Sequence, residues 1–338
     1  MSTEFPPLII PRAEAMAYSA AYESAVIFAC SDRGRIWMRE RDRAALLNRL
    51  STNQLEGLHP GQGCETVLTT PIGRMLDLLT VLCLEDAQLV ITSPGRGPAM
   101  LQHLRKQIFF NDKVEIEDAT LQLSQLALYG PLAKELLTDV GLPSASMSIH
   151  GVVTTAWHNV PLYIVTARPL GGSGFWLLAP PATLANLNRA LRAAGAYTLD
   201  ADTYQVLRVE AGHPVYGREI SLDYIPLETG LWDAVSFAKG CYVGQEIIAR
   251  MESRKRLAKA MRGLRFTGTP GLTSGGKPLA KLEADDKEAG DLTSVVESPR
   301  YGLIGLGYVR SAYLAGETPL HVAGSAVELV ELPFGLRI

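Results

Sequence analysis

The residues KGCYVGQE at 239–246 combine a cysteine with a nearby lysine and two glycines, and this combination can build a reactive thiol. The thiolate is the reactive form of cysteine, and a nearby cation or a helix N-terminus favours it. Lys239 supplies a cation, and a helical pattern that begins near Gln245 would direct its positive end toward the thiol. The glycines allow a tight turn or the close approach of a ligand. Two interpretations stay open: Cys241 is a reactive thiol, or it is a small apolar residue that fills a turn.

A basic run follows the cysteine. The stretch IIARMESRKRLAKAMR at 247–262 predicts a helix, and its cations are Arg250, Arg254, Lys255, Arg256, Lys259 and Arg262. Cations three or four residues apart share one face of a helix. Such a face could hold the acidic tail of a ligand or a phosphate backbone, and it could equally be an ordinary solvated surface.

The segment RVEAGHPVYGREI at 208–220 places Arg208 and Glu210 two residues apart. We expect this part of the chain to be extended, so that both side chains face one side, with a tight turn at Ala211 and Gly212. A carboxylate fixed beside a guanidinium can hold a heterocycle rich in N–H donors. The alternative is a structural ion pair.

Asp77 is a single carboxylate within the apolar run PIGRMLDLLTV at 71–81. Burying an unpaired carboxylate is costly, so Asp77 should lie at a ligand pocket or on a solvated strand face. Strand alternation does not decide between the two, because the residues at 75 and 79 are both apolar. A desolvated carboxylate can act as a base or orient a substrate nitrogen.

Other chemistry is not indicated. Cys30, Cys64 and Cys83 lie in apolar, strand-like contexts, and no two cysteines form a CxxC pair. The six histidines show no HxH or HExxH spacing, so we predict no metal site. The net charge of −3 lacks the signature of a nucleic-acid-binding protein. The N-terminus has no signal-peptide pattern and no apolar run approaches ~18 residues, so we expect a cytoplasmic protein away from the membrane.

The elements that must position these residues follow an α+β pattern. We expect strands at 25–29, 64–70, 75–84 and 88–92, with helices near 42–50 and 94–108, and a second strand-and-helix pattern over 122–195. From about residue 262 short strands broken by Gly, Pro and Ser predict a small all-β barrel or sandwich, with a solvated turn at 281–291. At 338 residues, two or three domains are expected.

The segment KGCYVGQEIIAR at 239–250 resembles the K-G-C-Y-x-G-Q-E signature of the YgfZ-type folate-binding proteins. These proteins are relatives of the glycine cleavage T-protein, and their mitochondrial member is an iron–sulfur maturation factor. Further segments resemble the family in the expected order, so the resemblance covers nearly the whole chain: LSTNQLEGLHPGQ at 50–62, YGPLAKELL at 129–137, RVEAGHPVYGREI at 208–220, DYIPLETGL at 223–231 and TSVVESPRYGLIGLGYVR at 293–310.

The resemblance implies an α+β, T-protein-like fold, with two α+β layers around a central folate hole and a small C-terminal β-barrel. The implied domains are a discontinuous first α+β domain at 1–48 and 122–205, a second at 49–121 and 206–260 that carries the cysteine motif, and the barrel at 261–338.

The resemblance also implies a tetrahydrofolate ligand. Glu210 would hold the pterin, and Arg250 with the basic run would bind the anionic glutamate tail. The remaining candidate ligand-binding side chains are those of Arg208, Lys239, Tyr242, Gln245 and Asn53. In the YgfZ branch, activity depends on the cysteine of the signature, which is Cys241 here.

The expected function is therefore that of a tetrahydrofolate-binding accessory factor in iron–sulfur cluster assembly or repair. Its expected partners are folate and iron–sulfur enzymes or assembly proteins, for example enzymes of tRNA modification, and we expect a monomer. The alternative is a tetrahydrofolate-dependent aminomethyltransferase or demethylase that uses Asp77. This residue falls where aminomethyltransferases carry the first aspartate of a G-G-x-x-D-D segment, but Leu78 replaces the second. A third possibility, an RNA-modification partner that uses the basic run, fits poorly with the net charge.

Overall fold

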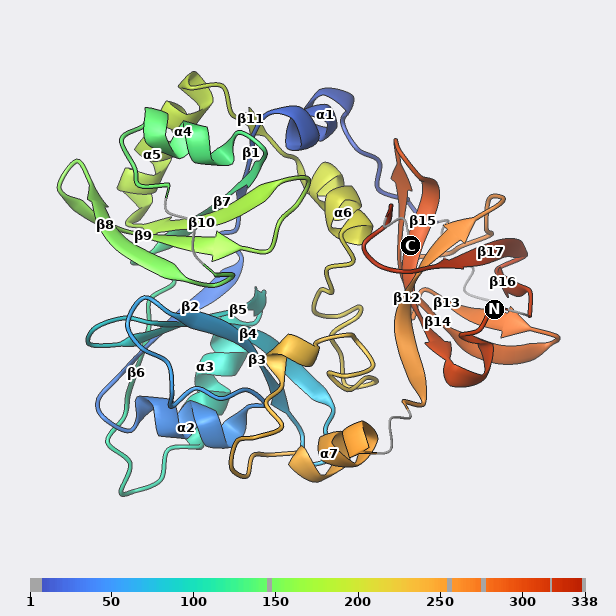
Figure 1. The fold of residues 1–338 in the computed structure, drawn as a ribbon, viewed down its shortest axis with the longest axis horizontal. Helices are drawn as coiled ribbons and strands as arrows, with labels where there is room; N and C mark the ends of the chain where they lie inside the picture. The colour runs from blue at the N-terminus through green and yellow to red at the C-terminus, as the bar shows by residue number, and fades with distance from the viewer. Residues whose placement is uncertain (1–7, 145–147, 254–256, 275–277, 317, 336–338) are drawn as a thin grey trace, which may run out of the picture. The chain divides into compact units, whose positions relative to one another are not determined.

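The computed structural model describes residues 8–144, 148–253, 257–274, 278–316 and 318–335 (Figure 1). The chain divides into two compact units. The two-sheet unit comprises Ser19–Leu199 and Trp232–Ile247, and the barrel unit comprises Met1–Tyr18, Asp200–Leu231 and Ile248–Ile338. Two helices, α1 (Ala15–Glu23) and α7 (Gln245–Ser253), contain a boundary between the units.

The first sheet of the two-sheet unit has six strands in the order β11-β1-β7-β10-β9-β8. Two helices, α4 (Ala133–Asp139) and α5 (Pro181–Ala193), cover one face through leucines at helical spacing, so their apolar stripes are buried against the sheet. The strands are β1 (Val26–Ala29), β7 (Ser124–Gly130), β8 (Val152–Trp157), β9 (Val160–Ala167), β10 (Ser173–Ala179) and β11 (Tyr197–Thr198).

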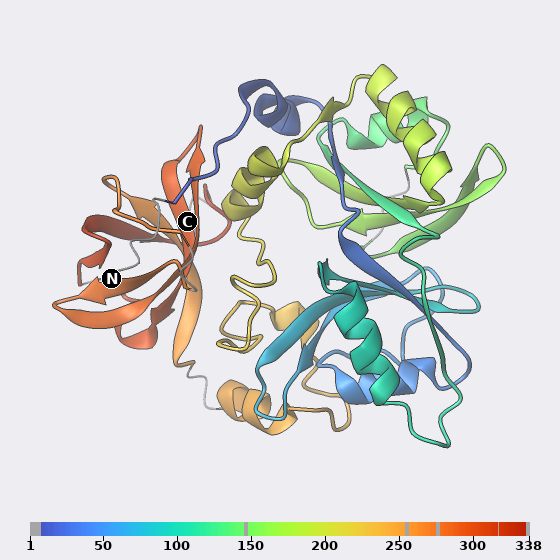
Figure 2. The same cartoon turned by 180° about the vertical axis from the view of Figure 1, so that it is seen from behind.

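The second sheet has five strands in the order β3-β4-β5-β2-β6. Its strands are β2 (Arg33–Arg39), β3 (Gly63–Thr69), β4 (Met75–Cys83), β5 (Gln88–Pro94) and β6 (Glu115–Asp118). The helices α2 (Arg43–Leu50) and α3 (Gly97–Lys106) pack their leucine and methionine side chains on one face. Figures 1 and 2 show the two sheets facing each other with the helices outside, and Trp37 contacts Tyr163 between the sheets at 6.1 Å between ring centroids.

The barrel unit is built on a closed six-stranded barrel in the order β12-β15-β14-β13-β16-β17. Its strands are β12 (Lys259–Phe266), β13 (Ala280–Ala284), β14 (Lys287–Ser298), β15 (Gly302–Arg310), β16 (Leu320–Val322) and β17 (Ser325–Val330). Helix α6 (Ala201–Glu210) packs against β14 and β15. Two sheets with helices and a C-terminal barrel confirm the expected α+β fold class.

Three local expectations are wrong. Residues 201–210 form helix α6 rather than an extended segment, because the Asp200 side chain caps the helix by accepting a hydrogen bond from the Thr203 N–H at 2.7 Å. The basic run is not one helix: α7 ends at Ser253, and β12 begins at Lys259 because its ladders with β15 and β17 close the barrel. Residues 254–256 lie outside the described residues.

The charged stretch at 281–291 is also not a solvated turn. It forms the β13–β14 hairpin, and only Asp285 and Asp286 make the turn, both with positive φ as a tight two-residue hairpin requires. Strands β2 and β6 were absent from the sequence prediction, because β2 is rich in arginine and β6 is acidic and exposed.

Candidate functional site

The KGCYVGQE residues form a loop that leads into α7, as the helical pattern predicts. Cys241 is the exposed cysteine of the chain, whereas Cys30 and Cys83 are buried and Cys64 is half-buried. Burial raises the pKa of Cys30 and raises that of Cys64 to about 12, which suppresses their thiolates. Among the cysteines, Cys241 is therefore the thiol that a reagent or partner can reach.

Lys239 is buried and directed toward the end of helix α2. Its ammonium donates hydrogen bonds to the carbonyl oxygens of Asn48, Ser51 and Asn53 at 2.5, 2.8 and 2.6 Å. Burial lowers the pKa of Lys239 to about 8, and the charges of Glu56 and Cys64 oppose this only in part. An ammonium carries three hydrogens, and all three are used within the protein.

The C-terminal half of the loop is held against the turn between β3 and β4. The Val243 N–H donates to the carbonyl of Arg49 at 3.3 Å, and the Thr69 hydroxyl donates to the carbonyl of Val243 at 2.5 Å. Gly244 has φ +84°, and a Cβ there would lie 2.6 Å from the carbonyl oxygen of Thr70. Only glycine fits this conformation and this close approach.

Three other candidate side chains belong to the same unit. Tyr242 is buried beneath the Lys239 ammonium, 5.1 Å from nitrogen to ring centroid, and burial raises its pKa to about 12. The Asn53 amide donates to the carbonyls of Glu65 and Asp233 at 2.8 and 2.9 Å, so both of its hydrogens are used. Gln245 is half-buried at the first position of α7.

Asp77 is fully buried on β4. Its carboxylate accepts hydrogen bonds from the N–H groups of Leu78 at 2.9 Å and Ser93 at 3.4 Å. Burial raises the pKa of Asp77 to about 6, although contacts with Ser93 and Arg96 partly oppose the rise. A carboxyl group with this pKa can exchange a proton near neutral pH.

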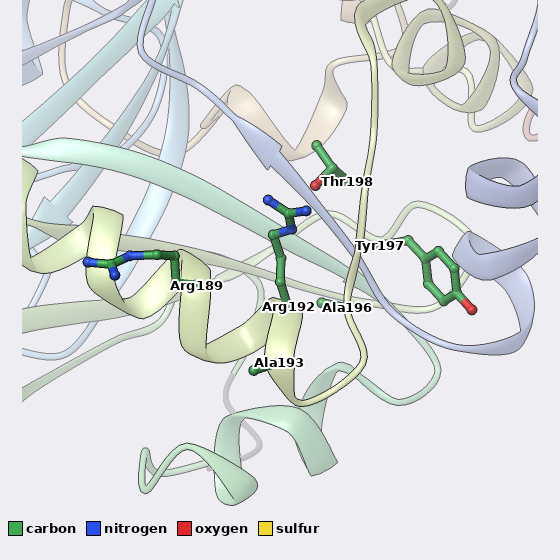
Figure 3. Close-up of a pocket in the computed structure, with 6 residues that line it drawn as sticks. All are labelled: Arg189, Arg192, Ala193, Ala196, Tyr197 and Thr198. Carbon is green, nitrogen blue, oxygen red and sulfur yellow. The ribbon is translucent and has the colours of Figure 1, made fainter.

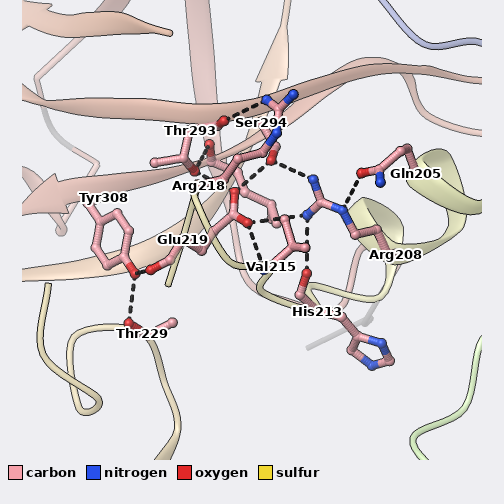
Figure 4. A network of polar contacts seen from close by, with 11 residues as sticks. Gln205, Arg208, His213, Val215, Arg218, Glu219, Thr229, Thr293, Ser294 and Tyr308 are labelled. Atoms are coloured by element: carbon pink, nitrogen blue, oxygen red, sulfur yellow. Dashed lines mark hydrogen bonds and ion pairs between the residues drawn. The ribbon is translucent and has the colours of Figure 1, made fainter. Parts of the chain in front are cut away.

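Arg208 and Glu219 form a buried ion pair in the barrel unit, with 3.3 Å between Nη1 and Oε2 (Figure 4). Arg208 also donates to the Ser294 hydroxyl at 2.7 Å, and Glu219 accepts from the hydroxyls of Ser294 and Thr293 at 2.6 and 2.7 Å. The network joins α6 to β14. It gives Arg208 a structural role inside the barrel unit.

Glu210 ends α6 and points in a different direction, because residues two apart in a helix do not share a face. Its Oε1 accepts hydrogen bonds from the hydroxyls of Tyr18 at 2.8 Å and Ser298 at 2.5 Å. The carboxylate is buried, and a heterocycle that binds there would have to replace or share these partners.

The described members of the basic run do not form one cationic surface. Arg250 is exposed in the last turn of α7. Lys259 lies over the ring of Tyr224 at 4.3 Å, and Arg262 forms an ion pair with Glu331 at 3.1 Å. The cation–π contact and the ion pair place these two side chains on the barrel.

Sequence reasoning missed a polar cluster between the two sheets. The Arg168 guanidinium donates from Nε and Nη2 to one oxygen of Glu65 at 3.0 and 2.7 Å, and His150 Nε2 lies 3.6 Å from the other oxygen. Burial opposes ionisation, but His150 and Arg168 outweigh it and lower the pKa of Glu65 to about 2. Because Glu65 and Arg168 are 103 residues apart, no local pattern could have joined them.

A surface cavity of about 450 Å³ lies elsewhere in the two-sheet unit, at the end of α5 beside β11 (Figure 3). Its lining includes Arg189, Arg192, Tyr197 and Thr198, and none of the predicted site residues. In the part of the chain that the structure describes, no three His, Cys, Asp or Glu side chains are grouped as a metal ion would need. None of the described helices is long and apolar enough to span a membrane.

The structure therefore separates the predicted site residues into two groups. Cys241, Lys239, Tyr242, Gln245 and Asn53 surround the loop in the two-sheet unit, and Asp77 is buried in the same unit. Arg208, Glu210 and Arg250 belong to the barrel unit. The loop presents an exposed cysteine sulfur between held residues, and the interior of the two-sheet unit holds a carboxyl group able to exchange a proton.

The comparisons with known proteins agree with the architecture. A chloroplastic protein of Arabidopsis thaliana named as a transferase is 32% identical over 296 residues, which cover 87% of this chain and 67% of that protein. The aminomethyltransferase of Rubrobacter xylanophilus is 29% identical over 324 residues, which cover 95% of this chain and 86% of that protein.

The crystal structure of the glycine cleavage system aminomethyltransferase T from Bartonella henselae has the same fold. It superposes with a TM-score of 0.82 and 21% identity, and the match covers 96% of this chain and 91% of that chain. Residues 10–239 match the family model described as the GCVT N-terminal domain. Because that model covers most of the chain, the protein belongs to the GCVT family, the family of the glycine cleavage T-protein.

Proposed function

We propose that the protein belongs to the YgfZ-type branch and is a tetrahydrofolate-binding accessory factor in iron–sulfur cluster assembly or repair. The observation that carries the proposal is the KGCYVGQE loop, which presents Cys241 to solvent while backbone contacts hold the residues on both sides. A fixed, exposed thiolate can attack an electrophilic sulfur or carbon, or ligate iron for a short time. One cysteine does not hold a cluster by itself, because clusters usually take four thiolates.

Tetrahydrofolate is the proposed ligand, and the GCVT family membership supports it. Glu210 is the proposed partner of the pterin, since a carboxylate accepts hydrogen bonds from adjacent N–H groups. Arg250 is exposed and offers a planar, bidentate donor for a carboxylate of the glutamate tail.

Two measurements test the proposal. The first is tryptophan fluorescence during titration with tetrahydrofolate, with the wild type compared with Glu210→Ala. The four tryptophans, Trp37, Trp157, Trp176 and Trp232, supply the fluorescence that a bound ligand can change. The wild type should bind and Glu210→Ala should bind at least about tenfold more weakly, as expected for loss of a charged hydrogen-bond acceptor. A wild type that does not bind would remove the folate premise.

The second measurement is complementation of a deletion strain. The wild-type gene should restore the activity of iron–sulfur enzymes such as tRNA methylthiotransferases, and Cys241→Ala should not. Cys64→Ala is the matched control, because that thiol is partly buried in β3. Full rescue by Cys241→Ala would rule out the role of the thiol.

The second candidate function is tetrahydrofolate-dependent aminomethyl transfer or demethylation by Asp77. Its support is the fully buried carboxyl group on β4, whose pKa is raised by burial to about 6, together with relatives named aminomethyltransferase. Turnover of a methylamine-type substrate to methylenetetrahydrofolate, lost in Asp77→Asn but kept in Cys241→Ala, would favour this function over the first.

A further inference from the structure

Two of the last four carbonyl groups of helix α2 accept hydrogen bonds from the KGCYVGQE loop. An α-helix leaves its last four carbonyl oxygens without partners inside the helix. Here the Lys239 ammonium binds the carbonyl of Asn48 at 2.5 Å, and the Val243 N–H binds the carbonyl of Arg49 at 3.3 Å. The loop thus caps α2 although Lys239 and Asn48 are 191 residues apart in sequence.

The charge of Lys239 is fully used in this cap. Beyond Asn48, the ammonium reaches the carbonyls of Ser51 and Asn53 at 2.8 and 2.6 Å, and the ring of Tyr242 packs against it. The negative end of the helix dipole adds to the attraction. Because every ammonium hydrogen has an acceptor within the protein, Lys239 has none to offer to a ligand.

Cys241 lies midway between two anchored residues. Lys239 holds the chain two positions before it, and Val243 holds the chain two positions after it through Arg49 and the Thr69 hydroxyl. Between them Gly240 and Cys241 form an exposed crest, and a Cβ added at Gly240 would meet no heavy atom within 4 Å. The place of the sulfur therefore depends on the two anchors.

We propose that Lys239 is a positioning residue for Cys241, which fixes the crest by capping helix α2. The inference rests on the proposed use of the Cys241 thiol. Removal of the ammonium leaves three backbone carbonyls without their donor, and the crest is then held only on its C-terminal side, by the buried Tyr242 and by Val243. Residue 241 then becomes mobile while the sheets of the unit keep their fold.

The test is the mobility of a nitroxide label attached to Cys241, measured by electron paramagnetic resonance in the otherwise unmodified full chain. Lys239→Met should shorten the rotational correlation time of the label by roughly threefold or more, as expected when a held loop gains nanosecond motion. Lys259→Met is the matched control: it also removes a lysine that packs on a tyrosine ring, but from the barrel unit, and should leave the spectrum unchanged. Cys241→Ser shows which signal comes from residue 241.

A second variant keeps the test decisive. Thr69→Val removes the hydroxyl that holds Val243 and should mobilise the label by itself. If Lys239→Met does not fold, Lys239→Gln replaces it; the amide has two N–H donors for three carbonyls and no charge, so the label should show a mobility between those of the wild type and Thr69→Val. A folded Lys239 variant with wild-type label mobility would overturn the inference. The spectra involve no folate and no cluster, so that result would leave the proposed function standing. Conversely, full rescue of the deletion strain by Cys241→Ala would rule out the proposed function and would leave the label spectra unaffected.

Discussion

The cluster of Glu65, Arg168 and His150 makes the free energy of unfolding of the two-sheet unit depend on pH in the acidic range. The folded pKa of Glu65 is about 2, against 4.5 for the ordinary side chain, a difference of 4.5 − 2 = 2.5 units. At about 1.4 kcal/mol per unit, the ionised carboxylate contributes about 3 kcal/mol to folding. Because the folded pKa is lowered, this stability is present above pH 4.5 and is lost as the pH falls toward 2.

The perturbation is Glu65→Gln, which keeps the shape of the side chain and removes its charge. Urea unfolding followed by tryptophan fluorescence gives the free energy of unfolding at pH 7 and pH 3. We expect the variant to be less stable by about 3 kcal/mol at pH 7. At pH 3 the unfolded chain binds the proton that folded Glu65 resists, so the difference from the wild type should shrink by about 2 kcal/mol.

Glu117→Gln is the control, because Glu117 pairs with Arg39 at 2.9 Å on the surface and a surface pair contributes little. A difference between wild type and Glu65→Gln that is the same at both pH values would refute the reasoning. It would mean that Glu65 acts through packing and neutral hydrogen bonds rather than through its charge.

Four other residues give separate predictions. Asp77→Asn should raise the free energy of unfolding above pH 6 by about 1–3 kcal/mol, as measured by urea unfolding. Because the folded pKa of Asp77 is raised to about 6, its protonated form favours the folded state below pH 3.8, and this contribution is lost as the pH rises through about 6. Arg208→Met should lower the free energy of unfolding of the barrel unit by about 3–5 kcal/mol, since it leaves Glu219 buried without its cation, and calorimetry would show it. Gly244→Ala should cost about 1–3 kcal/mol in thermal unfolding, because alanine is strained at φ +84° and would collide with a carbonyl oxygen; no loss would contradict the tight geometry of this turn. Iodoacetamide should alkylate Cys241 first by mass spectrometry of peptides, and faster labelling of any other cysteine in the native protein would be inconsistent with their burial.

The elements with a strong local signal could be predicted from sequence. The leucine spacing of α2 and the apolar strands β4 and β5 depend on neighbours a few residues away, and their predicted bounds lie within a few residues of the observed ones. Helix α6 was missed although its N-cap Asp200 precedes a helical pattern, because the pair at 208 and 210 suggested a two-residue period. The first half of strand β12 was assigned to a helix, because its partners β15 and β17 lie far along the chain.

The candidate site shows the same limit. The turn at Gly244 and the start of α7 are local, and the glycines of the motif indicated them. The hydrogen-bond partners of the Lys239 ammonium are not local, since the carbonyls of Asn48 and Ser51 lie at the C-terminal end of α2, 191 and 188 residues away in sequence. A lysine near a cysteine suggested a cation for the thiol or a ligand, and only the fold reveals that its charge is used by a helix end.

The discontinuity of the two-sheet unit has a consequence for biosynthesis. The sheets are complete once residue 199 has been made, but the segment Trp232–Ile247 that carries Cys241 is separated from them by residues of the barrel unit. During translation the carbonyls at the end of α2 therefore lack the Lys239 ammonium until that residue emerges from the ribosome. Closing the long chain segment between α2 and Lys239 is slow relative to local folding. A ribosome stalled before residue 239 would carry two formed sheets and no thiol crest, so Cys241 would be among the last features of its unit to take its final place.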